Sequence, residues 1–203
     1  MKKLLLGIAA VCLAGFTFAQ DAPLWMRHSV ISPDGTTIAF TYKGDIYTVP
    51  VAGGRAMQIT TNPAYDTAPV WSPDSKRIAF ASDRMGSLDV YIVAKDGGEP
   101  RRLTTHSGSE TPLAFTDAGH VLFSAGIMPS AEAVVFPSNG QFNQVYRVSV
   151  EGGRPTMISS MPMECISINK EGAMLYQDKN CLLYTSPSPR DRQISYAVFC
   201  LKK

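Results

Sequence analysis

The feature that most constrains the fold is a phrase that recurs at an interval of about 40 residues. Ser32–Phe40 returns as Ser72–Phe80, and a weaker copy follows at Phe115–Phe123. A repeat of this length with strand-like content is typical of β-propeller blades. The sequence therefore predicts an all-β repeat architecture, although propellers are scaffolds that serve many functions.

Each copy of the phrase is followed by a second strand-like segment and by a pair of glycines. The segments are Asp45–Val51, Asp89–Val93 and Gln144–Val150, and the pairs are Gly53-Gly54, Gly97-Gly98 and Gly152-Gly153. Apolar and polar residues alternate in these segments, as in half-buried strands. The glycines suit hairpin turns because they adopt positive φ at little steric cost. A further strand follows each pair, at 56–60, 101–104 and 155–159.

The repeated order of strands and turns also sets the expected blade boundaries. Asp66–Trp71 opens the second unit, which gives four antiparallel strands per blade. Pro33-Asp34 and Pro73-Asp74 form turns, because proline presets φ and aspartate bonds its own downstream backbone. We expect an incomplete β-propeller of about three and a half four-stranded blades within residues 20–180. Its expected units are 28–66, 67–110, 111–164 and the start of a next blade at 165–180. A general β-sandwich explains the turns but not the repeated order.

The third unit contains an insertion, Gly126–Asn143. Insertions in repeat proteins usually map to loops on one face, often the working face. A functional loop and a structural elaboration that packs over the blade both remain open.

Residues 1–19 read as a signal peptide. Lys2-Lys3 precedes an apolar stretch, Leu4–Phe18, that is too short to span a bilayer. Thr17 and Ala19 stand where cleavage before Gln20 requires small residues. We expect an exported bacterial protein, periplasmic or secreted; an uncleaved anchor helix is the alternative.

The repeated pattern of strands and turns stops after Asn180. Cys181–Asp191 resembles the translation of a transposon-end sequencing adapter, and Ile194–Leu201 resembles the flow-cell adapter that follows it. The order of the two matches predicts that residues 181–203 are an artefactual, disordered tail. The alternative is a genuine irregular C-terminus.

Removing both ends changes the charge. The signal holds two of the 19 basic residues, and the tail holds four of them with one of the 17 acidic residues. Residues 20–180 therefore carry 13 basic and 16 acidic residues, a formal charge of about −3 instead of +2. This balance implies neither a nucleic-acid partner nor an anionic membrane. Cys165 is the one cysteine of that segment, so no disulfide framework is expected.

No catalytic constellation is visible in the sequence. His28, His106 and His120 have no metal-ligand spacing with another histidine, a cysteine or a carboxylate. We expect His120 to be a turn or surface residue. His106-Ser107 lies where blades join and lacks the pattern of a nucleophile elbow.

Two further features have a structural interpretation. The loop Asp83–Asp89 lacks the alternating carboxylates of a calcium loop, so we expect a hairpin turn in which Asp83 bonds backbone amides. The aromatic residues that recur with the repeat are expected in the core; they are Trp25, Trp71, Tyr47, Tyr91 and Tyr146. We therefore assign no catalytic, cofactor-binding or metal-binding residue and no cofactor.

The repeated phrases resemble the WD40-like repeats of TolB and of tricorn-type peptidases. The fuller similarity is to the N-terminal propeller of exported tricorn protease homologues. It is carried by Ala22–Arg27, by Ser82–Arg84, by Gln144-Val145-Tyr146 after the insertion and by Leu175–Lys179. The resemblance covers Ala22–Asn180.

This resemblance implies a role but no site residue. In such peptidases a PDZ-like domain and a serine-peptidase core come after the propellers, and none of their catalytic residues has a counterpart here. The expected role is to guide or gate peptide or protein substrates toward a catalytic domain missing from this chain. Two alternatives stay open: a TolB-type periplasmic propeller that binds proteins without catalysis, and the propeller of a prolyl-oligopeptidase-type enzyme. The oligomeric state is not predicted.

Overall fold

The computed structural model describes residues 25–126, 143–159, 163–169 and 173–178. The predicted signal peptide, most of the insertion and the predicted tail lie outside these residues. Within them, no helix is long and apolar enough to cross a membrane.

The described residues form three four-stranded sheets and one two-stranded sheet, each antiparallel and in chain order. Blade 1 contains β1 (Arg27–Ile31), β2 (Thr37–Tyr42), β3 (Asp45–Pro50) and β4 (Met57–Gln58). Blade 2 contains β5 (Asp66–Trp71), β6 (Arg77–Ser82), β7 (Asp89–Ala94) and β8 (Arg101–Arg102). Blade 3 contains β9 (Glu110–Asp117), β10 (His120–Ala125), β11 (Gln144–Ser149) and β12 (Thr156–Ser159). The last hairpin is β13 (Met163–Ile168) with β14 (Met174–Asp178).

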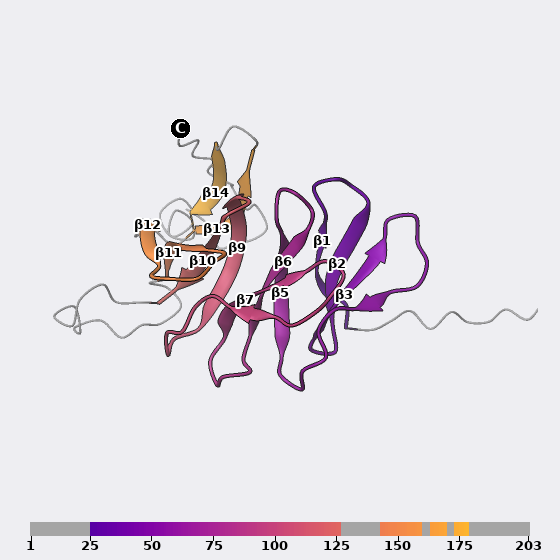
Figure 1. The fold of residues 1–203 in the computed structure, drawn as a ribbon. Helices are drawn as coiled ribbons and strands as arrows, with labels where there is room; N and C mark the ends of the chain where they lie inside the picture. The colour runs from indigo at the N-terminus through magenta and orange to yellow at the C-terminus, as the bar shows by residue number, and fades with distance from the viewer. Residues whose placement is uncertain (1–24, 127–142, 160–162, 170–172, 179–203) are drawn as a thin grey trace, which may run out of the picture.

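The sheets follow one another as consecutive blades (Figure 1). Their first strands, β1, β5, β9 and β13, contact one another in sequence order and form the inner side of the arc. This arrangement confirms the predicted fold class, an incomplete all-β propeller.

The repeated Ser-Pro-Asp phrase closes the turn between the first two strands of a blade. The Ser32 hydroxyl donates to Asp34 Oδ1 at 2.5 Å, and the Thr36 amide donates to the same oxygen at 3.0 Å. The matching distances at Asp74 are 2.5 and 3.2 Å. These hydrogen bonds lower the pKa of both aspartates, with the serine hydroxyl as the largest cause. Aspartate thus bonds its own downstream backbone, as predicted.

Apolar side chains from neighbouring blades form the core. The cluster between blades 1 and 2 contains Ala39, Ile46, Ile59, Trp71, Ile78, Phe80, Tyr91 and Val93. A tyrosine of the third strand stacks on the repeated phenylalanine in every blade, with ring centroids 5.8, 6.0 and 5.7 Å apart at Tyr47, Tyr91 and Tyr146. Trp71, Tyr91 and Tyr146 are buried, as expected for repeat-phased aromatics, whereas Tyr47 is only half-buried.

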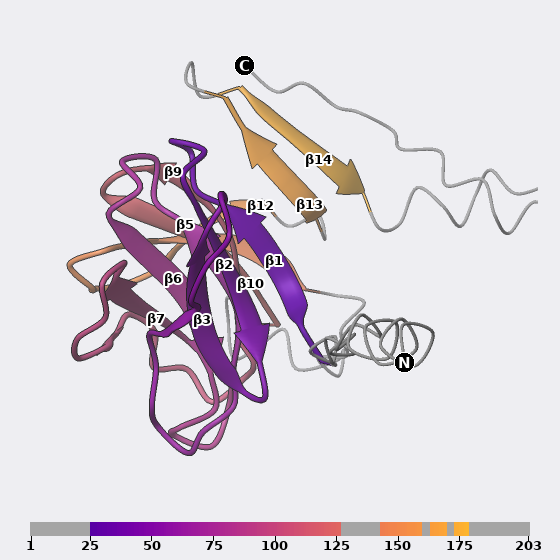
Figure 2. The same cartoon turned by 90° about the vertical axis from the view of Figure 1, so that its right-hand side faces the viewer.

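Blade 1 leaves one face uncovered among the described residues (Figure 2). Ile31 occupies the repeat position of Trp71, yet Ile31 is 58 % exposed and Trp71 is 8 % exposed. Ile38 is half-buried, whereas Ile78, its equivalent in blade 2, is fully buried. The difference arises because blade 2 packs against blade 1, and no described blade packs against the other face of blade 1.

Candidate functional site

Two exposed aromatic residues precede the inner strands of blades 1 and 2. Arg27 pairs with Thr41 in blade 1, and Thr67 pairs with Ala81 in blade 2. This register gives Trp25 and Tyr65 equivalent places one repeat apart. Their side chains remain 69 % and 43 % exposed.

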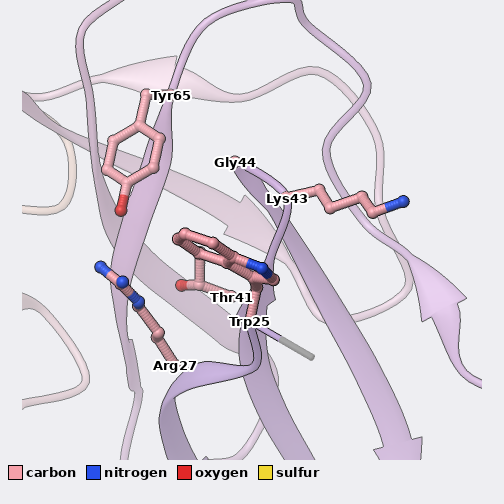
Figure 3. Close-up of a pocket in the computed structure, with 6 residues that line it drawn as sticks. All are labelled: Trp25, Arg27, Thr41, Lys43, Gly44 and Tyr65. Carbon is pink, nitrogen blue, oxygen red and sulfur yellow. The ribbon is translucent and has the colours of Figure 1, made fainter. Parts of the chain in front are cut away.

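The two aromatics line a hollow of about 430 Å³ beside the β2–β3 turn. The other lining residues are Arg27, Thr41, Lys43 and Gly44. In Figure 3 the Tyr65 hydroxyl and the Arg27 guanidinium point toward the space beside the indole ring, whereas the Lys43 ammonium points away. The Arg27 guanidinium carbon lies 5.3 Å from the Trp25 ring centroid, a cation–π distance.

Hydrogen bonds to the backbone of Tyr65 and Asp66 hold the Tyr65 side of this hollow. Asp83 Oδ1 accepts the Tyr65 amide at 2.7 Å, and the Asp83 amide donates to the Tyr65 carbonyl at 3.3 Å. The Asp66 amide donates to the Gly44 carbonyl at 2.7 Å. Lys43 and Gly44 both have positive φ, 52° and 90°, as a type I′ hairpin turn requires. The backbone of Tyr65 is therefore held in place, and its aromatic ring is exposed.

The expected core position of Trp25 is wrong. Trp25 takes the place of Tyr65 in the repeat, ahead of the inner strand, and it does not correspond to Trp71. No described blade packs over it, so its ring stays at the surface. The 40-residue separation of Trp25 and Tyr65 was the sequence signal that could have revealed this pair.

Buried carboxylates begin three strands of blades 2 and 3 at the same edge of the sheets. Asp66, Asp89 and Glu110 are all fully buried. Both Asp66 oxygens accept hydrogen bonds from Arg84 Nη2, each at 3.1 Å. Asp89 forms an ion pair with Arg102 at 2.7 Å. Sequence reasoning missed this group, because each carboxylate meets its neighbours only across strands.

Glu110 is the least compensated of the three carboxylates. Neither of its oxygens has a hydrogen-bond partner of good geometry among the described residues, although the Thr104 hydroxyl and the Asp89 carboxyl are close enough to act on its pKa. His106 Nδ1 lies 4.0 Å from Oε1. Burial raises the pKa of Glu110 to about 7, and the nearby Asp89 carboxylate adds to the rise. The Thr104 hydroxyl and the Arg102 guanidinium oppose it.

The raised pKa of Glu110 predicts a pH dependence of stability. The folded state binds this proton more tightly than the unfolded chain, so Glu110 stabilises the fold most at acidic pH. Its contribution is lost as pH rises from 4.5, the ordinary pKa, through about 7. Urea unfolding at pH 5 and pH 8 should therefore show a smaller loss of stability in Glu110→Gln than in the unmodified chain. An equal loss in both proteins would contradict the assignment.

His106, His120 and Asp83 contact residues of turns and loops. His120 begins β10 and is partly exposed, and its Nδ1 lies 3.0 Å from Asp117, in agreement with a surface position. His106 Nδ1 accepts the Gly108 amide at 3.0 Å in the β8–β9 connection. Asp83 bonds a backbone amide as predicted, that of Tyr65. Among the described residues, no three histidine, cysteine or acidic side chains are grouped to hold a metal ion.

Comparison with known proteins places this geometry in a family. The family of tricorn protease N-terminal beta propeller domains matches residues 23–187. The chain belongs to this family. The match ends within residues 181–203, whose adapter origin stays a prediction.

Curated relatives of this propeller are much longer than the chain. It is 35 % identical to Tricorn protease homolog 1 of Streptomyces coelicolor over 102 residues, which are 50 % of the chain and 9 % of that protein. It is 30 % identical to the uncharacterized peptidase YuxL of Bacillus subtilis over 129 residues, 63 % of the chain and 20 % of that protein. The chain thus spans a fifth or less of these relatives.

Solved structures share the propeller fold. TolB from Acinetobacter baumannii superposes with a TM-score of 0.57 at 19 % identity, over 76 % of this chain and 41 % of TolB. The tricorn protease superposes with a TM-score of 0.54 at 12 % identity, over 75 % of this chain and 19 % of the protease. At these identities the likeness concerns the fold alone.

Proposed function

We propose that this propeller guides or gates peptide substrates of an exported tricorn-type serine peptidase whose catalytic domain lies outside the chain. Membership of the tricorn N-terminal propeller family supports the peptidase context. The signal-like residues 1–19 support export to the periplasm or the exterior. The proposed partners are peptide or protein substrates and further domains of the same polypeptide.

The hollow between Trp25 and Tyr65 is the observation that carries the proposal. It offers two exposed aromatic rings and the Arg27 guanidinium around a space of about 430 Å³. Aromatic side chains supply apolar contact area with a polar tip, and a cation beside them favours carboxylate groups. This combination suits an extended peptide with acidic or aromatic side chains.

Binding to this hollow should be visible in tryptophan fluorescence. The chain has two tryptophans, and Trp71 is buried while Trp25 is exposed. Titration with an acidic, aromatic-containing pentapeptide should shift the Trp25 emission to shorter wavelength with saturation. Tyr65→Ala should weaken binding about tenfold, which corresponds to the lost aromatic contact. Met85→Ala, which trims an exposed side chain outside the hollow, is the control. No saturable shift, or equal weakening by both variants, would reject the hollow as a peptide site.

The two alternative functions differ from the proposed one in the domain encoded after the propeller. We expect the intact locus to continue, beyond the codon for Asn180, into further blades, a PDZ-like domain and a serine-peptidase core. A long-read sequence across this junction tests the expectation. A propeller that closes without a catalytic region would support the TolB-type protein, and a Gly-x-Ser-x-Gly elbow would support the prolyl-oligopeptidase type.

A further inference from the structure

We propose that the hollow between blades 2 and 3 is a binding site for a guanidinium group, with Glu110 as its counter-ion. This hollow measures about 490 Å³ and is separate from the one at Trp25. Its lining residues that matter here are Thr104, Thr105, His106, Glu110, Arg154 and Met157.

The neighbouring junction shows what such a hollow accepts. An equivalent hollow of about 550 Å³ lies between blades 1 and 2, lined by the repeat counterparts Thr60, Thr61 and Tyr91. Arg84 lines that hollow and donates to both oxygens of Asp66. Its guanidinium carbon also lies 4.5 Å from the Tyr91 ring centroid. At the first junction the chain thus supplies its own guanidinium to the buried carboxylate.

The junction between blades 2 and 3 has an equivalent carboxylate, Glu110, but no counterpart of Arg84 among the described residues. Glu110 begins β9 as Asp66 begins β5, and the two residues are equivalent in the repeat. Arg84 stands in the β6–β7 connection, whose counterpart in blade 3 is the β10–β11 connection. Residues 127–142 of that connection contain neither lysine nor arginine. The insertion therefore has no cation to offer to Glu110.

Glu110 has no close cation among the described residues, and both of its oxygens are closed to solvent, so a ligand cation reaches them only when side chains at the rim of the hollow move. Arg102 is held by Asp89 at 2.7 Å, and His106 Nδ1 stays 4.0 Å from Glu110. Arg154 is exposed, and none of the described ion pairs joins it to Glu110. A buried carboxylate without a hydrogen-bond partner is costly, and a guanidinium pairs with it bidentately. The chemistry of the site therefore favours an arginine side chain of a peptide or a free guanidinium compound.

The experiment uses N-acetyl-L-arginine amide and its uncharged isostere, N-acetyl-L-citrulline amide, with the full 203-residue chain. Calorimetric titration at pH 8 should give a dissociation constant below about 1 mM for the arginine compound and no saturable binding of the citrulline compound. Glu110→Gln should weaken binding at least tenfold. Glu151→Gln, which removes an exposed carboxylate of the same blade, should leave it unchanged within twofold. Equal effects of the two variants would overturn the proposal.

A second variant keeps the test decisive if Glu110→Gln does not fold. Thr105 is exposed at the rim of the hollow, so Thr105→Trp should block entry without disturbing the core. It should abolish binding of the arginine compound. Retained binding would place the ligand elsewhere and reject the site.

Proton linkage gives a readout that separates this site from nonspecific attraction. Because the ligand requires ionised Glu110, affinity should rise about tenfold from pH 6 to pH 8 as this carboxyl, with its pKa of about 7, loses its proton. His106→Asn removes the imidazole as a second source of pH dependence, while Asp89 and Arg102 remain in place. A flat profile in His106→Asn would contradict the role of Glu110.

Discussion

Replacing Phe80 by alanine is expected to cost about 3–5 kcal/mol of unfolding free energy, the usual range for a buried phenylalanine. Phe80 is fully buried in the cluster between blades 1 and 2. Its ring stacks on Tyr91 with centroids 6.0 Å apart, and the Arg84 guanidinium carbon lies 5.7 Å from its centroid. Truncation leaves a cavity bordered by two separate sheets. Neither sheet can move to close this cavity without losing its packing against the other. Urea unfolding followed by circular dichroism measures the change.

Phe40→Ala is the matched control. Phe40 is the repeat counterpart of Phe80 and stacks on Tyr47 in the same way, with centroids 5.8 Å apart. It belongs to blade 1, one face of which no described blade covers. We expect its truncation to cost at least about 1 kcal/mol less, because fewer apolar atoms surround the ring. Equal costs would show that another part of the protein covers this face.

Arg84→Met is expected to destabilise the chain by about 3–5 kcal/mol, because it leaves a buried charge without its partner. Asp66 is fully buried, and both of its oxygens depend on Arg84. Methionine keeps much of the aliphatic length of arginine, so the loss comes mainly from the missing guanidinium. Chemical denaturation at pH 7 measures the effect.

Two further variants test whether the cost belongs to the ion pair. In Arg84→Met with Asp66→Asn, the buried charge is gone, so the double variant should be more stable than Arg84→Met alone. Glu151→Gln breaks the ion pair with Arg101, whose side chains are 76 % and 50 % exposed, and should cost at most about 1 kcal/mol. Strictly additive effects in the double variant would show that Arg84 acts through packing, independently of Asp66.

The proposed roles of the two hollows concern different steps of substrate handling. The hollow at Trp25 lies beside the inner strand of blade 1 and combines aromatic rings with the Arg27 guanidinium. The hollow at Glu110 lies between blades 2 and 3 and contains a buried carboxyl group with a raised pKa. A peptide that carries an acidic or aromatic residue and an arginine would satisfy both, and each hollow has its own test with its own variants.

The order of strands and turns within a blade was predictable from sequence because it depends on local chemistry. Period-two alternation marks a strand, and the Ser-Pro-Asp and Gly-Gly signals mark turns, wherever they occur along the chain. Their recurrence at about 40 residues then fixed four strands per blade and the incomplete propeller. The burial of Tyr91 and Tyr146 was predictable because both tyrosines recur at the same position of the repeat.

The candidate sites depend on contacts between units, and only the tertiary structure decided them. Trp25 and Tyr65 share a hollow because two inner strands lie side by side, and Arg84 reaches Asp66 across 18 residues of sequence. Whether Glu110 has a partner depends on which side chains the next blade brings to it. A repeat pattern shows which residues are equivalent but not what each of them faces, because packing between blades sets the surroundings. For this reason the sequence determined the architecture of this propeller, and the structure determined where it can bind.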